Sequence, residues 1–405
     1  MFPMPMYEPD YSMKKAAVEK LRRSIARLRR PSLRLDVADL LGRKPISLDT
    51  PQLQRFLAGK HVLVSGAGGS IGSEICRQAM RFCPRRLILL EQAENNLFEI
   101  DRELRQRWVG ADIVPALADV ADAARVEAVF AQHQPQVIFH CAAHKHVPMM
   151  ELNPGEAIKN NVFGTKVIAD AALSAGAAAF VMVSTDKAVN PTSVMGAAKR
   201  CAELYIQSLN ARDSADAPRF VAVRFGNVLG SSGSVVPIFA KQIDSGGPVT
   251  VTHPEMQRYF MTIPEASQLV MQAGAIGQGG EIFILDMGQP IKILKLAREM
   301  IRRRGLIPGR DIAIEFTGIR PGEKLYEELA CASEKTRPTT HPKIRVWQLP
   351  RATPEQVDQM LQTLTAVINS ARPQVVAALQ QCVPEYQPTP AVESAPAMRL
   401  VADAA

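Results

Sequence analysis

The side chains best suited to acid–base chemistry stand together in one stretch, STDKAVNPTSVMGAAK at residues 184–199. It follows the apolar run Ala178–Val183, whose lack of helical spacing predicts a buried parallel strand. Open α/β sheets bind ligands at the carboxyl ends of such strands. There, the carboxyl group of Asp186 and the amine of Lys187 could give protons to a bound substrate and take them from it. On this stretch alone, a strand end with a surface Asp–Lys pair remains an alternative.

A glycine-rich stretch after an earlier strand favours ligand binding. The predicted strand His61–Ser65 leads into GAGGSIG at residues 66–72 and then into a helical pattern. Glycines at this spacing permit a tight turn and let backbone N–H groups approach a pyrophosphate at a helix N-terminus. The position between a strand and a helix is the one that this function needs. The predicted cofactor contacts in the stretch are Gly66, Gly68, Gly69, Ser70, Ile71 and Gly72.

The end of the next predicted strand, Arg86–Leu90, indicates which dinucleotide is bound. Glu91 follows it, roughly 20 residues after the glycines, where an acidic side chain accepts hydrogen bonds from ribose hydroxyls. The same carboxylate would repel a 2′-phosphate. The sequence therefore predicts NAD rather than NADP.

The elements that must position these residues alternate between strands and helices. Predicted strands lie at 61–65, 86–90, 112–117, 136–140, 178–183 and 220–224, and predicted helices at 70–81, 95–108, 123–132, 154–175 and from about Ser193. This alternation predicts an α/β fold with a doubly wound parallel Rossmann-type sheet. A smaller α/β lobe is expected to complete the substrate site.

Several motifs resemble one family. The glycine loop and Lys199 are similar to the extended short-chain dehydrogenase/reductase superfamily, although Met195 stands where that superfamily usually has a tyrosine. STDK at 184–187 together with MGAAK at 195–199 resembles the membrane-associated nucleotide-sugar 4,6-dehydratases of bacterial polysaccharide and glycan synthesis, which act on UDP-N-acetylglucosamine. The resemblance runs from about Leu35 to about Val346. Its further motifs are AAHKHVP at 142–148, RFGNVLG at 224–230, PEMQRYFMT at 254–262 and GIRPGEK at 318–324.

The resemblance implies a set of site residues. The implied catalytic positions are Thr185, Asp186, Lys187, Met195 and Lys199. Further implied NAD contacts are Asp119, Val120, Ala142 and Lys199. The implied substrate contacts are Lys145, His146, Asn161, Asn227, Arg258, Arg320 and Glu323. Among these, Arg258 and Arg320 are expected to clamp the diphosphate, because guanidinium forks match phosphate oxygens. Asn161 is also expected to steady the wall beside Lys199, and Glu323 could simply brace its loop.

The implied reaction assigns tasks to these residues. Hydride passes from sugar C4 to NAD⁺, the C5 proton is removed, water leaves from C6, and hydride returns to C6. Lys187 is the expected C5 base, so its amine must be neutral, with a pKa depressed by burial or by a nearby cation. Asp186 is the expected acid at C6, and Lys199 is expected to bind the nicotinamide ribose. Met195 cannot transfer a proton, so deprotonation of the C4 hydroxyl passes to Asp186, Thr185 or water.

Other functions remain open. Inverting members of the family carry a tyrosine at position 195, so Met195 predicts retention at C5, with inversion as the alternative. A nucleotide-sugar 4-epimerase would need the missing tyrosine. A non-catalytic NAD-binding module is favoured by that loss and disfavoured by the intact Thr-Asp-Lys run. No metal is expected at HCAAHKH (140–146), because His140 and Cys141 point to opposite sides of a strand and no distant pair completes a ligand set.

Composition agrees with an enzyme of this kind. The chain has 405 residues, 47% of them hydrophobic, which suits a Rossmann-type domain, a smaller lobe and tails. Its six cysteines lack paired or CxxC spacing, which predicts reduced thiols in the cytoplasm. The chain is not expected to bind nucleic acid, and it is expected to form a homo-oligomer. There is no apolar run of roughly 18 residues and no signal-peptide pattern.

Most of the net charge of +8 lies at the start of the chain. Residues 1–34 hold nine Lys or Arg and three Asp or Glu, a net charge of +6. This segment could be a solvated helix, or it could lie near the anionic inner face of the cytoplasmic membrane. The resembling family carries transmembrane helices ahead of this point, so the chain is expected to be either a truncated part or a soluble member.

Five parts are expected along the chain. They are a basic arm and linker at 1–50, the NAD-binding domain at 51–230, an interleaved substrate lobe at 231–350, a helical appendage at 351–382 and a disordered tail at 383–405. The segment 226–234, rich in Gly and Ser, is expected to be a loop between the lobes.

Overall fold

The computed structural model describes residues 51–210, 218–329, 336–348, 352–389 and 398–400. The predicted basic arm and linker, residues 1–50, lie outside the described residues. Within the described ranges, no helix is both long enough and apolar enough to cross a membrane.

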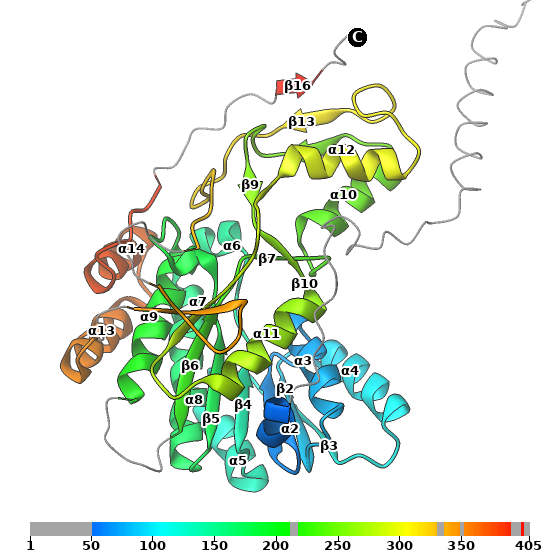
Figure 1. The fold of residues 1–405 in the computed structure, drawn as a ribbon. Coiled ribbons are helices and arrows are strands. Elements are labelled where there is room, and N and C mark those ends of the chain that lie inside the picture. Colours follow the sequence, from blue (N-terminus) through cyan, green and yellow to red (C-terminus); the bar gives the residue numbers. More distant parts are fainter. Residues whose placement is uncertain (1–50, 211–217, 330–335, 349–351, 390–397, 401–405) are drawn as a thin grey trace, which may run out of the picture. The chain divides into compact units, whose positions relative to one another are not determined.

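Nine strands of the described residues form one sheet, in the order β14-β15-β11-β6-β5-β4-β1-β2-β3 (Figure 1). Neighbours from β3 to β11 pair in parallel, whereas β15 is antiparallel to both β11 and β14. The order reverses between β1 and β4, so the crevice at their carboxyl ends is the expected ligand position. The strands are β1 His61–Ser65, β2 Arg86–Glu91, β3 Ile113–Leu117, β4 Val137–His140, β5 Ala179–Val183, β6 Arg219–Arg224, β11 Ile282–Leu285, β14 Thr336–Pro338 and β15 Ile344–Trp347.

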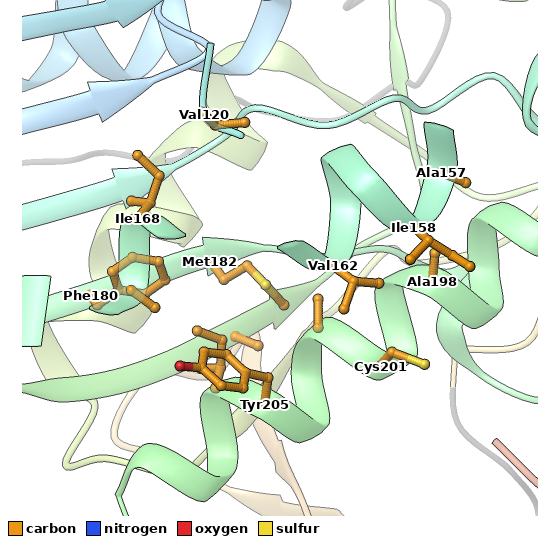
Figure 2. Close-up of a cluster of buried hydrophobic side chains, with 14 of the residues drawn as sticks. Val120, Ala157, Ile158, Val162, Ile168, Phe180, Met182, Ala198, Cys201 and Tyr205 are labelled. Atoms are coloured by element: carbon orange, nitrogen blue, oxygen red, sulfur yellow. The ribbon is translucent and has the colours of Figure 1, made fainter. Parts of the chain in front are cut away.

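Helices cover both faces of this sheet. Strand β1 shows why, because Leu63 packs into one apolar core and Val62 and Val64 pack into the other. In the first core, Figure 2 shows Phe180 and Met182 of β5 near Tyr205 of α9. The predicted doubly wound α/β fold is thus confirmed. The first core is covered by α5 Ala123–His133, α8 Thr165–Ser174 and α9 Val194–Leu209, and the second by α2 Pro51–Leu57, α3 Ser70–Met80, α4 Glu94–Arg107 and α11 Ile263–Ile276.

The remaining described strands form three small sheets. They pair β7 Asn227–Leu229 with β10 Phe260–Thr262, β9 Gln257–Arg258 with β12 Ile291–Lys292, and β13 Ile314–Phe316 with both β8 Val249–Val251 and β16 Met398–Leu400. Helices α10 Val235–Asp244 and α12 Ile293–Arg303 accompany them. Strand β11 belongs to the main sheet, and α11 covers one face of that sheet. The chain after residue 230 therefore alternates between the main sheet with its helices and the three small sheets.

Two predicted segments differ in the structure. The predicted single helix 154–175 consists of α7 Pro154–Ala157, the π-helical turn η2 Ile158–Gly164 and α8. Wide π-helical turns inside helices often mark functional sites. The segment 226–234, predicted to be a loop, contains strand β7. This strand pairs with β10, which lies much later in the sequence, so no local pattern announces it.

The C-terminal segment also differs from its prediction. Thr353 caps α13 Pro354–Val367 in a capping box, and α14 Arg372–Cys382 follows, as the helical appendage requires. The tail was expected to be disordered from residue 383, and this is wrong for 383–389. Tyr386 is 2% exposed in the first core, and the Gln387 N–H donates to the Pro191 carbonyl (2.9 Å). Burial of one aromatic side chain outweighs the polar composition around it.

Candidate active site

The catalytic candidates begin where β5 ends. The Ser184 N–H donates to the Val223 carbonyl (2.7 Å), and the Asp186 N–H donates to the Phe225 carbonyl (3.1 Å). A short 3₁₀ turn, η3 Asp186–Ala188, follows. These bonds tie the catalytic loop to β6 and its continuation, so the backbone at Asp186 is held from two sides.

Asp186 and Lys187 form an ion pair in which Asp186 is buried and the Lys187 side chain is 20% exposed. Lys187 Nζ lies 2.9 Å from Asp186 Oδ1, which also accepts a hydrogen bond from Thr185 Oγ1 (2.9 Å). Nζ further lies 3.3 Å from Asn227 Oδ1 and 3.6 Å from Glu327 Oε1. Because Asp186 is only 1% exposed, the alternative of a surface Asp–Lys pair is wrong.

The protonation of Lys187 differs from the prediction. Burial acts to lower its pKa, but the charges of Asp186 and Glu327 outweigh burial and raise the pKa above its ordinary value. Arg258 opposes them, yet two nearby carboxylates have the larger combined effect. The predicted depressed pKa is therefore wrong for this arrangement of charges.

Glu327 is a site residue that sequence reasoning missed. Its side chain is 2% exposed, and burial raises its pKa, with Asp186 acting in the same direction. Lys187, Arg258 and Lys324 lower it in part. Only its place shortly after GIRPGEK gave a signal, and nothing in the sequence separates it from the neighbouring Glu328, whose side chain is 46% exposed.

The glycine loop follows β1 as predicted. Gly66 has a φ of +65°, and a Cβ there would come within 2.8 Å of the Ala142 nitrogen. A Cβ on Gly72 would lie 2.0 Å from the Gly66 carbonyl oxygen, so neither position has room for a side chain. The loop ends at Gly69, the N-cap of α3, so an anion bound there would meet the positive end of a helix dipole.

A cavity of about 180 Å³ lies beside this loop. It brings together five of the predicted cofactor residues, Gly66, Gly69, Glu91, Val120 and Ala142. It is not lined by the other predicted cofactor contacts, Gly68, Ser70, Ile71, Gly72, Asp119 and Lys199. The cavity has the character expected for the adenosine half of a dinucleotide, with glycine backbone, apolar walls and one carboxylate.

Glu91 has a second task in the structure. Its Oε2 accepts from the Gly68 N–H and its Oε1 from the Ala93 N–H, both at 3.0 Å. The carboxylate therefore braces the glycine loop. Each of its oxygens has a second lone pair that could still accept from a ribose hydroxyl.

Lys199 and Met195 lie on α9, which begins after Ser193 caps it with a hydrogen bond from the Gly196 N–H (3.1 Å). Burial lowers the pKa of Lys199 to about 8, against the smaller opposing effects of Glu203 and Cys141. Met195 is 3% exposed and belongs to the first apolar core. The tyrosine position thus holds a packing residue, with no group that exchanges protons.

His140 is a structural residue. Its Nδ1 lies 2.7 Å from Ser65 Oγ and its Nε2 lies 2.9 Å from Thr165 Oγ1. Burial, aided by Lys199, lowers its pKa to about 3. Across the described ranges, no group of three His, Cys, Asp or Glu side chains could hold a metal ion.

The wall at residues 144–146 is held from two directions. Asn161 accepts from the His144 N–H (2.8 Å) and donates to the His144 carbonyl (2.9 Å). It is fully buried and braces this wall through His144, and its contact with substrate stays a prediction. Lys145 Nζ donates to the Ser232 carbonyl (2.8 Å), and His146 lies against Gly233, so this wall meets the segment after β7.

The two predicted diphosphate arginines have different surroundings. Arg258 is 8% exposed and donates to the carbonyls of Gln257 (2.7 Å) and Leu325 (3.3 Å). Its Nη1 is therefore bonded within the protein, and its part in a diphosphate clamp stays a prediction. Arg320 is 56% exposed and pairs with Glu323 at 2.5 Å, so it can turn to an anion, and Glu323 braces its loop.

A mainly parallel sheet defines a Rossmann-type nucleotide-binding protein when a glycine loop lies at its switch point. Here the loop follows β1, and the Asp186–Lys187 ion pair follows β5 at the same edge of the sheet. A family model described as "Polysaccharide biosynthesis protein" matches residues 62–349. The chain belongs to this family.

Individual relatives agree with the family. The chain is 54% identical to the capsular polysaccharide biosynthesis protein CapD of Staphylococcus aureus, over 82% of this chain and 55% of that protein. It is 32% identical to a UDP-N-acetylglucosamine 4,6-dehydratase (inverting) of Campylobacter jejuni, over 66% of this chain and 77% of that enzyme. The chain spans about half the length of the first of these relatives.

Solved structures agree with the fold. Pen from Bacillus thuringiensis is 34% identical and covers 74% of this chain and 90% of its own, with a TM-score of 0.68. Other structures include dTDP-glucose 4,6-dehydratases and a UDP-glucose 4-epimerase with NAD bound, at 15–21% identity and TM-scores of 0.52 to 0.55. This second group shows the fold alone.

Proposed function

We propose that this chain catalyses the NAD-dependent 4,6-dehydration of UDP-N-acetylglucosamine to UDP-2-acetamido-2,6-dideoxy-α-D-xylo-hexos-4-ulose, for bacterial polysaccharide or glycan synthesis. The observation that carries the proposal is the Asp186–Lys187 ion pair at the carboxyl end of β5, on the edge that also holds the glycine loop. The similarity to the Campylobacter dehydratase supports this substrate and the 4,6-dehydration. That enzyme is described as inverting, so retention at C5 rests on Met195 alone.

The proposed cofactor site consists of the glycine loop, Glu91 and the cavity beside them. When bound, NAD would supply the acceptor for the C4 hydride and the donor of the hydride to C6. The backbone around Gly66 and Gly69 would hold the pyrophosphate, Glu91 the adenosine ribose and Lys199 the nicotinamide ribose. Protein purified without added nucleotide should release NAD on denaturation, and release of NADP would contradict the role of Glu91.

The proton steps need a neutral base and a protonated acid at the same time. Transfer of one proton from Lys187 Nζ to Asp186 Oδ1, over the observed 2.9 Å, supplies both without changing the net charge of the site. The neutral amine can then take the C5 proton, and the carboxylic acid can protonate the departing C6 hydroxyl. The raised pKa of Lys187 describes its resting state, in which the amine holds the proton beside the charges of Asp186 and Glu327.

Met195 bears on the rival functions. A 4-epimerase and a 4,6-dehydratase must both deprotonate the C4 hydroxyl, and Met195 supplies no group for this step. Only the dehydratase also needs a base at C5 and an acid at C6, the roles proposed for Lys187 and Asp186. A non-catalytic NAD-binding module would have no need for the charged Asp186–Lys187 pair, whose buried carboxylate is costly to desolvate.

Product analysis tests the proposal directly. The purified chain is incubated with UDP-N-acetylglucosamine, and the sugar is followed by NMR. The proposal expects a C6 methyl signal and a hydrated or free C4 ketone. Formation of UDP-N-acetylgalactosamine would indicate epimerase activity, and unchanged substrate with NAD bound would favour the non-catalytic module.

The cellular setting is part of the proposal. We infer action at the inner face of the cytoplasmic membrane, with contact through the basic residues 1–34, and a homo-oligomeric assembly. The net charge of +6 on that segment supports the first inference. Flotation of the full chain with anionic vesicles and its sedimentation velocity test the two separately.

A further inference from the structure

One buried ionisable side chain beside the catalytic pair has no task in the reaction described above. Glu327 comes from the segment between β13 and β14, and its Oε1 lies 3.6 Å from both Lys187 Nζ and Arg258 Nε. Its side chain is 2% exposed. We propose that Glu327 is a positioning residue for Lys187, holding the amine between two carboxylates, its own and that of Asp186. This inference rests on the function proposed above.

The surroundings of the Lys187 amine carry the geometric argument. Nζ lies near three oxygens from three separate segments, Asp186 Oδ1 at 2.9 Å, Asn227 Oδ1 at 3.3 Å and Glu327 Oε1 at 3.6 Å. An ammonium group has three N–H donors. Each donor can therefore face one of these oxygens, which fixes the direction of a side chain that is otherwise flexible.

The segment that carries Glu327 is attached to the catalytic loop. Lys324 Nζ donates to the Val189 carbonyl (3.0 Å), and Thr192 Oγ1 donates to the Gly322 carbonyl (3.1 Å). Asn190 Nδ2 lies 3.3 Å from Glu328 Oε2. Because these contacts lie on both sides of Glu327 along its segment, its carboxylate is placed relative to Lys187 by several independent bonds.

The unused oxygens of the two carboxylates favour a functional interpretation. In the part of the chain that the structure describes, Asp186 Oδ2 and Glu327 Oε2 are buried and have no hydrogen-bond partner. A buried acceptor without a partner destabilises the fold. An ion pair kept for stability alone would use both oxygens, whereas a site that must accept a proton or a substrate hydroxyl leaves one open.

The charges that face Lys187 determine the expected effect of a substitution. Asp186 and Glu327 raise the pKa of Lys187, and Arg258 lowers it. Lys324 acts on the Glu327 carboxyl itself. Replacing Glu327 by Gln removes one of the two anions and leaves Arg258 in place, so the pKa of Lys187 should fall. Neutral amine would then appear at a lower pH than in the unchanged chain.

The experiment measures the Lys187 amine directly. The full chain is acetylated with acetic anhydride across a pH series, and modification of Lys187 is read by peptide mass spectrometry. Glu327→Gln should move the midpoint downward by roughly one pH unit or more, as expected for loss of a neighbouring opposite charge. Glu327→Asp keeps the charge but shortens the side chain by one methylene, so the acetylation midpoint should fall less. Glu328→Gln is the comparison variant, because it removes the exposed charge next in sequence while its amide oxygen can still accept hydrogen bonds from Asn190 and Lys324.

Turnover of UDP-N-acetylglucosamine provides the second readout. The descending limb of kcat/KM against pH should move down with the acetylation midpoint in Glu327→Gln, because above the pKa of Lys187 the pair has lost the proton that Asp186 must donate. If the midpoint moves but no variant converts this substrate, the proposed function is wrong and the positioning role stands. An unchanged midpoint in folded Glu327→Gln overturns the role. Loss of folded protein in both Glu327 variants also overturns it, because Glu327 would then be structural.

Discussion

At the scale of residues, the site consists of an ion pair between the amine of Lys187 and the buried carboxylate of Asp186. Asp186 is 1% exposed, and its Oδ1 accepts hydrogen bonds from Lys187 Nζ and Thr185 Oγ1. Burial makes each charge depend on the other, since an isolated charge there would be costly. A single proton transfer within the pair therefore changes the chemistry available to a substrate without a change in net charge.

Lys187→Ala and Asp186→Asn should each lower kcat by about 10² or more, the scale of general acid–base groups. Met195→Leu is the matched control. Met195 is buried in the apolar core, and leucine keeps its volume, so kcat should change little. Steady-state rates with UDP-N-acetylglucosamine, together with thermal midpoints, separate chemistry from folding. If Met195→Leu were as damaging as Lys187→Ala, the assignment of roles would be wrong.

At the scale of elements, the sequence predicts the parts whose signals are local. The glycine loop, the strand before it and the polar residues after β5 each have a pattern that is complete within a few residues. Contacts between distant segments leave no such pattern. Strand β7 depends on β10, and the burial of Glu327 depends on how its segment meets the loop after Lys187. The motif at 254–262 identifies an arginine at position 258, but it does not show that this side chain donates to the carbonyls of Gln257 and Leu325.

The docking of the 318–328 segment can be tested at one glycine. Gly322 has a φ of +80°, and a Cβ there would lie 2.8 Å from Glu151 Oε1 and 2.9 Å from Ser193 Cβ. Gly322→Ala should therefore destabilise the fold by about 1–2 kcal/mol of backbone strain, plus a further ~1–3 kcal/mol for the close contact. It should also lower kcat by displacing Glu327.

Gly318→Ala is the control for that substitution. Gly318 has a similar φ of +85°, but a Cβ there would meet nothing within 4 Å. It should show the backbone strain without the contact term, so its thermal midpoint should fall less and its kcat should stay near that of the unchanged chain. Equal losses in the two variants would mean that the close approach at Gly322 contributes nothing.

At the scale of the whole molecule, the order of the strands gathers residues that the sequence keeps apart. Ser65 and His140 end the neighbouring strands β1 and β4, and Val183 ends β5 beside them. The glycine loop and the Asp186–Lys187 pair therefore open onto one edge. Asn227 and Glu327 are added to that edge by the second part of the molecule. A substrate would thus be approached by Lys187 from one fixed direction.

That single direction of approach predicts the stereochemical outcome. One group that removes the C5 proton and returns a proton to the same face keeps the configuration at C5, and Lys187 can do both from its fixed position between Asp186, Asn227 and Glu327. In deuterated water the product should carry deuterium at C5 with the D-xylo configuration, because the lysine amine exchanges with solvent. Substrate deuterated at C4 should transfer that label to C6, and NMR of the product reads both positions. An L-arabino product would mean that the proton returns to the opposite face, and solvent deuterium at C6 in place of the C4 label would contradict internal hydride transfer.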